Sequence, residues 1–140
     1  MASGVFDLIH PGHLFYLSEA KKLGAELIVV VARDSTVKRL KNHYPIVPEK
    51  NRLQIVQALK QVDRAILGSK RDIFQTVRKI KPDIIALGPN QSWNEAKLKA
   101  ELKARGLNAK ICRIRKKKEG PFSSTSEIVS HLLTKAKDLK

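Results

Sequence analysis

Gly4-Val-Phe-Asp-Leu-Ile-His10-Pro-Gly-His13 is the stretch from which the fold of this chain is best understood. It joins an apolar, strand-like segment, residues 1–6, to a helical pattern in which Leu14, Leu17 and Ala20 are apolar. Proline is favoured in the first turn of a helix, where the N–H that it lacks would have no partner. We therefore expect both histidines at a helix N-terminus, where free backbone N–H groups and the helix dipole attract an anion. This turn predicts a phosphate site.

Outward from this stretch, apolar strand-like runs alternate with helical patterns along the whole chain. After residues 1–6, the apolar runs are 27–32, 64–67, 84–87 and 110–114. The helical patterns are 11–23, 34–40, 48–60, 72–80, 94–105 and a last one from Ser124, where Ser-Thr-Ser-Glu matches a capping box. Apolar strands that alternate with helices indicate a parallel sheet covered on both faces. We predict an α/β, Rossmann-like fold with a parallel five-stranded sheet and helices on both faces, in a single domain over residues 1–140.

The composition narrows the class of protein. The 140 residues contain a single cysteine, Cys112, and no apolar run near 18 residues, so we expect no disulfide and no transmembrane helix. No secretory signal pattern opens the sequence, and a cytoplasmic protein is expected. Lys and Arg number 28 against 13 Asp and Glu, a net charge of +15. Such a charge favours an anionic partner without choosing among nucleotide, nucleic acid and acidic membrane.

The polar residues that stand out all follow predicted strands. Parallel strands end at one edge of the sheet, and ligands bind in the crevice beyond that edge. The residues expected there are Asp7, His10 and His13 after the first strand, Gly88, Asn90 and Gln91 after the fourth, and Ser123, Ser124 and Thr125 after the last. Their position at one edge predicts a single site.

The two histidines suggest the chemistry of this site. The sequence contains neither a Walker A motif nor G-x-G-x-x-G, so neither common phosphate loop is present. Imidazole N–H groups can donate to phosphate oxygens, and Gly12 between the histidines lets backbone approach closely. Such donors at a helix N-terminus would stabilise charge on a phosphate while pyrophosphate is displaced.

The motifs at the two ends of the sequence resemble those of a known family. Gly4-Val5-Phe6-Asp7 followed by His10-Pro11-Gly12-His13 is similar to the G-T-F-D…H-x-G-H motif of the cytidylyltransferase-like nucleotidyltransferases. Residues 123–126 resemble the family's C-terminal phosphate motif. Residues 29–37 and 81–88 narrow the resemblance to the archaeal FAD synthases, which transfer AMP from ATP to FMN and release pyrophosphate.

This resemblance implies roles for individual residues. His10 and His13 would contact the ATP phosphates, Asp7 would organise the loop or the metal-bound phosphates, and Arg52 would reach a phosphate from the third helix. The catalytic set is therefore His10, His13, Asp7 and Arg52. The nucleotide-binding set is Val5, Phe6, His10, Pro11, Gly12, His13, Asn90, Lys118, Ser124 and Thr125.

The resemblance implies a metal ion, and the sequence departs from the family pattern at two positions. A divalent cation, Mg²⁺ by expectation, would bind mainly through the substrate phosphates, and no residue is assigned as a metal ligand. Val5 replaces the family's Thr, which removes a hydroxyl near the phosphates. Gly88-Pro-Asn90-Gln replaces the more usual Gly-Tyr-Asp-Gln at the nucleoside contact.

Several alternatives remain open at the level of sequence. The same chemistry could act on CTP and glycerol 3-phosphate, or the chain could be a catalytically silent, basic nucleic-acid-binding module. Few aromatic residues accompany the basic run formed by Arg113 and residues 115–118, which argues against nucleic acid and favours substrate steering. Taken alone, Arg52 could be a surface cation and Ser124 only a helix cap. A homodimer is compatible with the family resemblance, and membrane binding is not expected.

Overall fold

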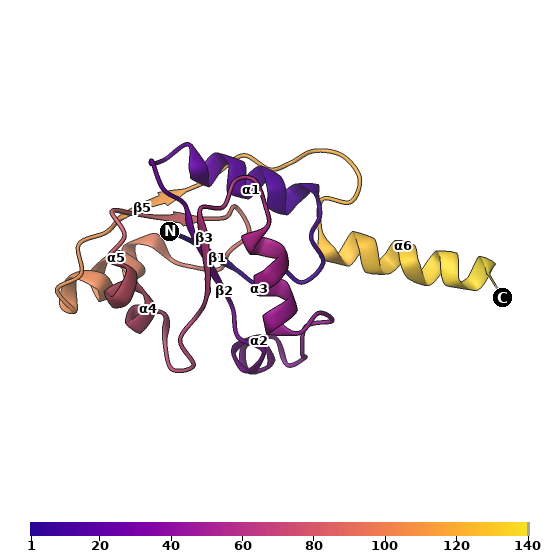
Figure 1. Cartoon of the computed structure of the whole chain (residues 1–140), viewed down its shortest axis with the longest axis horizontal. Coiled ribbons are helices and arrows are strands. Elements are labelled where there is room, and N and C mark those ends of the chain that lie inside the picture. The colour runs from indigo at the N-terminus through magenta and orange to yellow at the C-terminus, as the bar shows by residue number, and fades with distance from the viewer. Residues whose placement is uncertain (140) are drawn as a thin grey trace.

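A computed structural model describes residues 1–139 of the chain. Within them, five parallel strands form one sheet in the order β3-β2-β1-β4-β5. The strands are β1 (Ala2–Gly4), β2 (Ile28–Val31), β3 (Arg64–Leu67), β4 (Ile84–Leu87) and β5 (Lys110–Arg113). This is the predicted Rossmann-like α/β architecture (Figure 1).

Six helices connect or follow these strands within the same residues. They are α1 (Pro11–Lys21), α2 (Asp34–Lys41), α3 (Glu49–Gln57), α4 (Ile73–Ile80), α5 (Glu95–Ala104) and α6 (Thr125–Asp138). The helices predicted from Asp72 and Asn94 begin one residue later, because each of these residues is an N-cap whose side chain accepts a backbone N–H. None of the helices in residues 1–139 is both long and apolar enough to cross a membrane.

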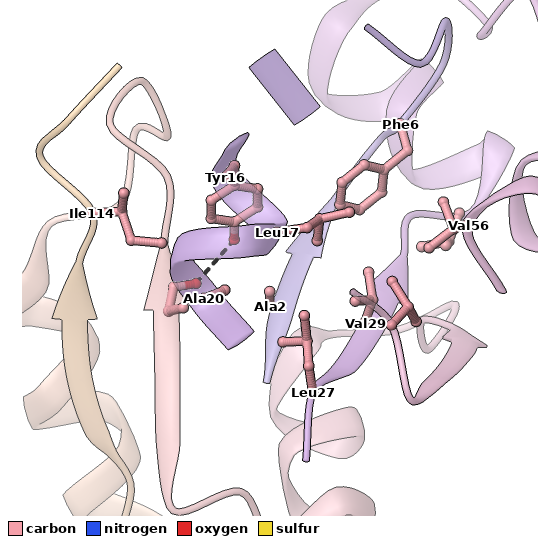
Figure 2. Close-up of a cluster of buried hydrophobic side chains, with 12 residues drawn as sticks. Ala2, Phe6, Tyr16, Leu17, Ala20, Leu27, Val29, Val56 and Ile114 are labelled. Carbon is pink, nitrogen blue, oxygen red and sulfur yellow. Dashed lines mark hydrogen bonds between the residues drawn. The ribbon is translucent and has the colours of Figure 1, made fainter. Parts of the chain in front are cut away.

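Strand alternation divides the core into two layers. Val29 and Val31 of β2 pack with α1 and α3 on one face of the sheet, and Val30 packs with α4 and α5 on the other. Figure 2 shows the first layer, in which Tyr16 and Leu17 of α1 lie against Ala2 of β1. Helices on both faces explain why nearly every residue of β2 and β4 is buried.

The central strand β1 marks the place where a ligand site is expected. Ala2 of β1 is in register with Val29 of β2 on one side and with Ala86 of β4 on the other. The connections after β1 and β4 therefore leave the sheet side by side at the switch point, where ligands bind in sheets of this kind. The phosphate motif predicted at residues 4–13 follows β1 and lies at this place.

Helix α6 extends away from the sheet and the other helices (Figure 1). Its sequence predicted a helix from Ser124 correctly, and Ser124 is its N-cap. Among the residues that the structure describes, however, α6 has no buried side chain, and Leu132 and Leu133 are 58% and 63% exposed. The apolar pattern of α6 therefore identifies the helix but not a packed face.

Candidate active site

His10 and His13 cap the first turn of α1 reciprocally. His10 is the N-cap residue, and its Nδ1 accepts the backbone N–H of His13 at 3.3 Å. The Nδ1 of His13 accepts the backbone N–H of His10, also at 3.3 Å. This is the geometry of a capping box, built from two imidazoles in place of Ser and Glu. Pro11 occupies the first helical position, as predicted.

The reciprocal capping assigns the tautomer of both rings. A nitrogen that accepts an N–H carries no proton, so each neutral ring must carry its proton on Nε2. The rings stack with centroids 3.7 Å apart and an interplanar angle of 25°. Within residues 1–139, neither Nε2 has a protein hydrogen-bond partner. Two adjacent N–H donors are therefore left for a ligand.

The charge state of the pair follows from its surroundings. The pKa of His13 is lowered to about 4, mainly by burial and also by nearby His10, while Asp7 opposes the shift. Burial also lowers the pKa of His10, against the attraction of Glu127. Both imidazoles are consequently neutral near pH 7, which is the state that the reciprocal capping requires.

The start of α6 lies directly against the start of α1. A methyl group added at Gly12 would be 2.3 Å from the carbonyl oxygen of Ser123, so the two segments touch at backbone level. Ser124 accepts the N–H of Glu127 at 3.2 Å, and Glu127 accepts the N–H of Ser123 at 2.8 Å. Two helix N-termini thus meet, and the two motifs predicted to bind phosphate lie against each other. Thr125 is the first residue of α6 in this arrangement.

Asp7 holds the loop between β1 and α1. Its carboxylate accepts the backbone N–H groups of Ile46 and Val47 at 2.9 and 2.8 Å. The preceding residue, Phe6, has a φ of +53° and is buried, with its ring 5.3 Å from that of His13. Of the two roles expected for Asp7, the contacts support the organisation of the loop.

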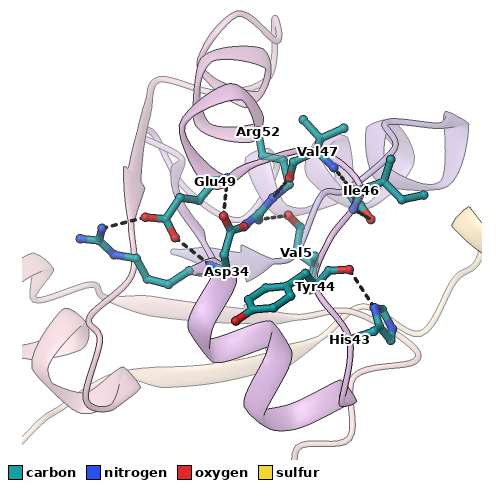
Figure 3. Close-up of polar contacts among 10 residues, drawn as sticks. Val5, Asp34, His43, Tyr44, Ile46, Val47, Glu49 and Arg52 are labelled. Atoms are coloured by element: carbon teal, nitrogen blue, oxygen red, sulfur yellow. Dashed lines mark hydrogen bonds and ion pairs between the residues drawn. The ribbon is translucent and has the colours of Figure 1, made fainter.

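Arg52 has a different environment from the one expected. Its side chain is fully buried rather than at a phosphate site. It donates to the carbonyls of Val47 and Val5 at 2.8 and 2.7 Å and to Asp34 Oδ1 at 2.7 Å (Figure 3). All three groups of N–H donors are directed at protein acceptors, because a buried guanidinium requires partners. The phosphate contact predicted for Arg52 is therefore replaced by a contact with the backbone of Val5, beside the histidine loop.

The connection after β4 lies beside the end of β1. Gln91 accepts the N–H of Gly88 at 3.0 Å and donates to the carbonyl of Ser3 at 2.7 Å, which ties this connection to β1. The hydroxyl of Tyr16 in α1 donates to Ala86 at 3.1 Å, and burial raises its pKa. Asn90, predicted at the nucleoside, is exposed on the same connection.

The basic run divides into two parts in the structure. Lys118 is exposed in the loop between β5 and α6. The pKa of Glu19 in α1 is lowered mainly by its hydrogen bond with Lys22, and Lys116 of this loop contributes to the same direction. This loop therefore passes close to α1. Arg113 does not belong to the exposed patch, since its side chain is only 15% exposed and bonded to residues 88–95.

The residues present do not form a metal cage of their own. Among residues 1–139, no three His, Cys, Asp or Glu side chains are placed to hold a metal ion together. The carboxylate of Asp7, whose charge opposes the lowering of the His13 pKa, already accepts two backbone N–H groups.

Sequence reasoning missed the residues that support this site. Asp34 and Glu49 each accept the other's backbone N–H, at 3.2 and 2.7 Å, and so join the starts of α2 and α3. Arg33 bonds to Glu49 and to the carbonyl of Gly68. A carboxylate in a first helical turn was the available signal, but it does not reveal a partner on another helix.

Comparison with known proteins agrees with this geometry. The model of the family described as cytidylyltransferase-like matches residues 1–131. A protein named FAD synthase from Methanothermus fervidus is 53% identical over 135 residues, covering 94% of this chain and 92% of that protein. A protein of the same name from Archaeoglobus fulgidus is 48% identical, covering 96% of this chain and 97% of the relative.

A solved structure extends the comparison to three dimensions. The crystal structure of a protein described as the lipopolysaccharide core biosynthesis protein from Thermoplasma volcanium GSS1 superposes with a TM-score of 0.81 and 51% sequence identity. The match covers 85% of this chain and 96% of that structure. With the matched histidine motif, the sheet order and the two converging helix N-termini, the chain belongs to the cytidylyltransferase-like family.

Proposed function

We infer that this chain is an FAD synthase, a nucleotidyltransferase that transfers AMP from ATP to FMN and releases pyrophosphate. Relatives named FAD synthase are 48% to 53% identical to it over nearly its whole length. The observation that carries the chemistry is the stacked, reciprocally capped pair of His10 and His13 beside Ser123.

The reaction needs positioning and charge stabilisation rather than a protein nucleophile. A phosphate oxygen of FMN attacks the α-phosphorus of ATP, a new P–O bond forms, and the bond to the β-phosphate oxygen breaks. Pyrophosphate leaves with the electron pair of that bond. Negative charge shifts toward the β-phosphate as this bond breaks, and donors that are already oriented stabilise it without reorganisation.

The assigned residues supply these donors from two helices. The Nε2–H groups of His10 and His13 would donate to ATP phosphate oxygens, while the N-termini of α1 and α6 provide free backbone N–H groups. Gly12 keeps the two helix starts in contact. Thr125 at the start of α6, and Lys118 in the loop before it, would reach the same phosphates.

The remaining predicted residues shape the pocket. Val5 and Phe6 line it through the loop that Asp7 and Arg52 hold in place, Pro11 sets the start of α1, and Asn90 faces the nucleoside. A divalent cation bound through the phosphates would offset their charge and orient the triphosphate. ATP and FMN are accordingly the substrates.

A panel of nucleotides and acceptors tests this function. The chain would be incubated with each of ATP and CTP, paired with FMN or glycerol 3-phosphate, and the products identified by mass. We expect FAD from ATP and FMN, and little product from the other pairs. His10→Ala and His13→Ala should each remove most of the pyrophosphate release. Efficient formation of CDP-glycerol, or full activity in both variants, would contradict the proposal.

A further inference from the structure

Arg113 binds the connection between β4 and α5 along its length. It is the last residue of β5, and its Nη1 donates to the carbonyls of Gly88 and Gln91 at 2.9 and 3.0 Å. Its Nη2 donates to the carbonyl of Trp93, and its Nε to Glu95 Oε1 at 2.7 Å. One planar guanidinium therefore donates hydrogen bonds to three backbone carbonyls and a carboxylate of residues 88–95.

The same connection is fixed a second time from the side of β1. The Gln91 side chain bridges the N–H of Gly88 and the carbonyl of Ser3. Residues 88–93 have no helix or strand to hold them, so these side-chain contacts define their path. A guanidinium offers five donors in a rigid fork, whereas a lysine ammonium is a compact point charge and cannot span acceptors this far apart along a loop.

The connection held in this way lies at the switch point of the sheet, where ligands bind in sheets of this kind. It leaves the carboxyl end of β4 beside the histidine loop that follows β1, where the strand order reverses. Asn90 at its turn is exposed and makes no hydrogen bond with any residue in 1–139, and Trp93 is 38% exposed. An amide side chain can pair with the N6 and N7 edge of adenine through two hydrogen bonds, while a carboxylate accepts from the amino group of cytosine.

We propose that Arg113 is a positioning residue for nucleotide selection, which fixes the path of residues 88–93 and so holds Asn90 where it can meet the adenine of ATP. This inference rests on the proposed function for the identity of the nucleotide. Arg113 acts through the loop and does not itself touch the reacting phosphates. Its loss should therefore change the preference for ATP over CTP more than the rate of the chemical step.

Equilibrium binding separates this inference from the proposed function. The dissociation constants of ATP and CTP would be measured by calorimetry for the unmodified chain, Arg113→Lys and Asn90→Asp. Arg105→Lys is the matched control, because Arg105 also pairs with a carboxylate of α5, Glu101, but on the surface. FAD formation by the unmodified chain is measured separately, so a failure of the proposed function is seen there.

We expect Arg113→Lys to lower the preference for ATP over CTP roughly tenfold, and Asn90→Asp to lower it at least as much. The preference of Arg105→Lys should equal that of the unmodified chain. If Arg113→Lys does not fold, Glu95→Gln tests the same clamp with a milder change, and we expect a smaller loss in the same direction. An unchanged ratio in the folded Arg113 or Glu95 variant, even with a lower melting temperature, would show that Arg113 only stabilises the fold.

Discussion

The backbone of Gly12 lies so close to the carbonyl oxygen of Ser123 that no side chain fits between them. The first residue belongs to the histidine motif after β1, and the second to the segment that starts α6. This contact brings together two motifs from opposite ends of the sequence. It also explains why glycine is needed between the histidines, although its φ is not positive.

Replacing Gly12 with alanine should separate the two motifs. Its Cβ would lie 2.3 Å from Ser123 O and 2.9 Å from two atoms of the His10 ring, and the backbone oxygen cannot rotate away. We expect Gly12→Ala to destabilise the chain by about 1–3 kcal/mol and to reduce FAD formation strongly. Chemical denaturation and initial rates measure the two effects. Gly24→Ala is the matched control, because nothing lies within 4 Å of a Cβ there; similar losses in both variants would contradict the steric explanation.

The two histidines combine a structural and a catalytic role that substitutions can separate. His10→Ala removes both the helix cap, worth about 1 kcal/mol, and the Nε2–H donor. His10→Asn restores a good capping side chain but not that donor. We expect both variants to lose about 10²- to 10³-fold in kcat, and only the alanine variant to lose stability. Recovery of activity in His10→Asn would mean that capping alone is what the reaction requires.

Stability should depend on pH through His13. Its pKa falls from the ordinary 6.5 to about 4 in the folded chain, so the unfolded chain binds more protons between these values. The free energy of unfolding should therefore decrease as the pH falls from 6.5 toward 4 and stay level above this range. Urea midpoints across the range measure the slope. His13→Ala should flatten it, and the same slope in that variant would show that other groups are responsible.

Arg52 should behave as a buried structural ion pair rather than as a phosphate ligand. Arg52→Met would remove the donor that now serves Asp34 Oδ1 and the carbonyls of Val5 and Val47. Breaking such a pair costs about 3–5 kcal/mol, and we expect the lower end because Asp34 is partly exposed. Lys50→Met, an exposed position on the same helix, should change stability by less than about 0.5 kcal/mol. Weaker ATP binding at unchanged stability in Arg52→Met would instead favour a phosphate contact.

Local sequence signals predicted the elements of this fold well. Pro11 at the start of α1, and the caps at Asp72, Asn94 and Ser124, act within one helical turn. Such contacts depend only on neighbours in the sequence. The strands were predicted in a similar way, because continuous runs of β-branched residues indicate strands that are buried on both faces. The convergence of residues 4–13 and 123–125 at one edge also followed from the common edge at which parallel strands end.

The sequence pattern could not predict contacts between distant segments of the chain. Arg52 lies in a helix beside Lys50, and Arg113 precedes a run of exposed cations, so both look like surface residues in the sequence. Arg52 is fully buried and Arg113 is largely covered, because each donates to carbonyls of another segment. The direction of α6 could not be predicted either. An apolar stripe predicts a helix, but it does not show which element, if any, the helix packs against.

The transfer of the α-phosphorus tests the central claim most directly. The chain would be supplied with FMN and with ATP labelled either at the α- or at the γ-phosphorus, and the label would be followed into products. We predict that the α-label appears in FAD and the γ-label in pyrophosphate, with equal amounts of the two products. Release of γ-label as inorganic phosphate with no α-label in FAD would contradict the assignment of this chain as an FAD synthase.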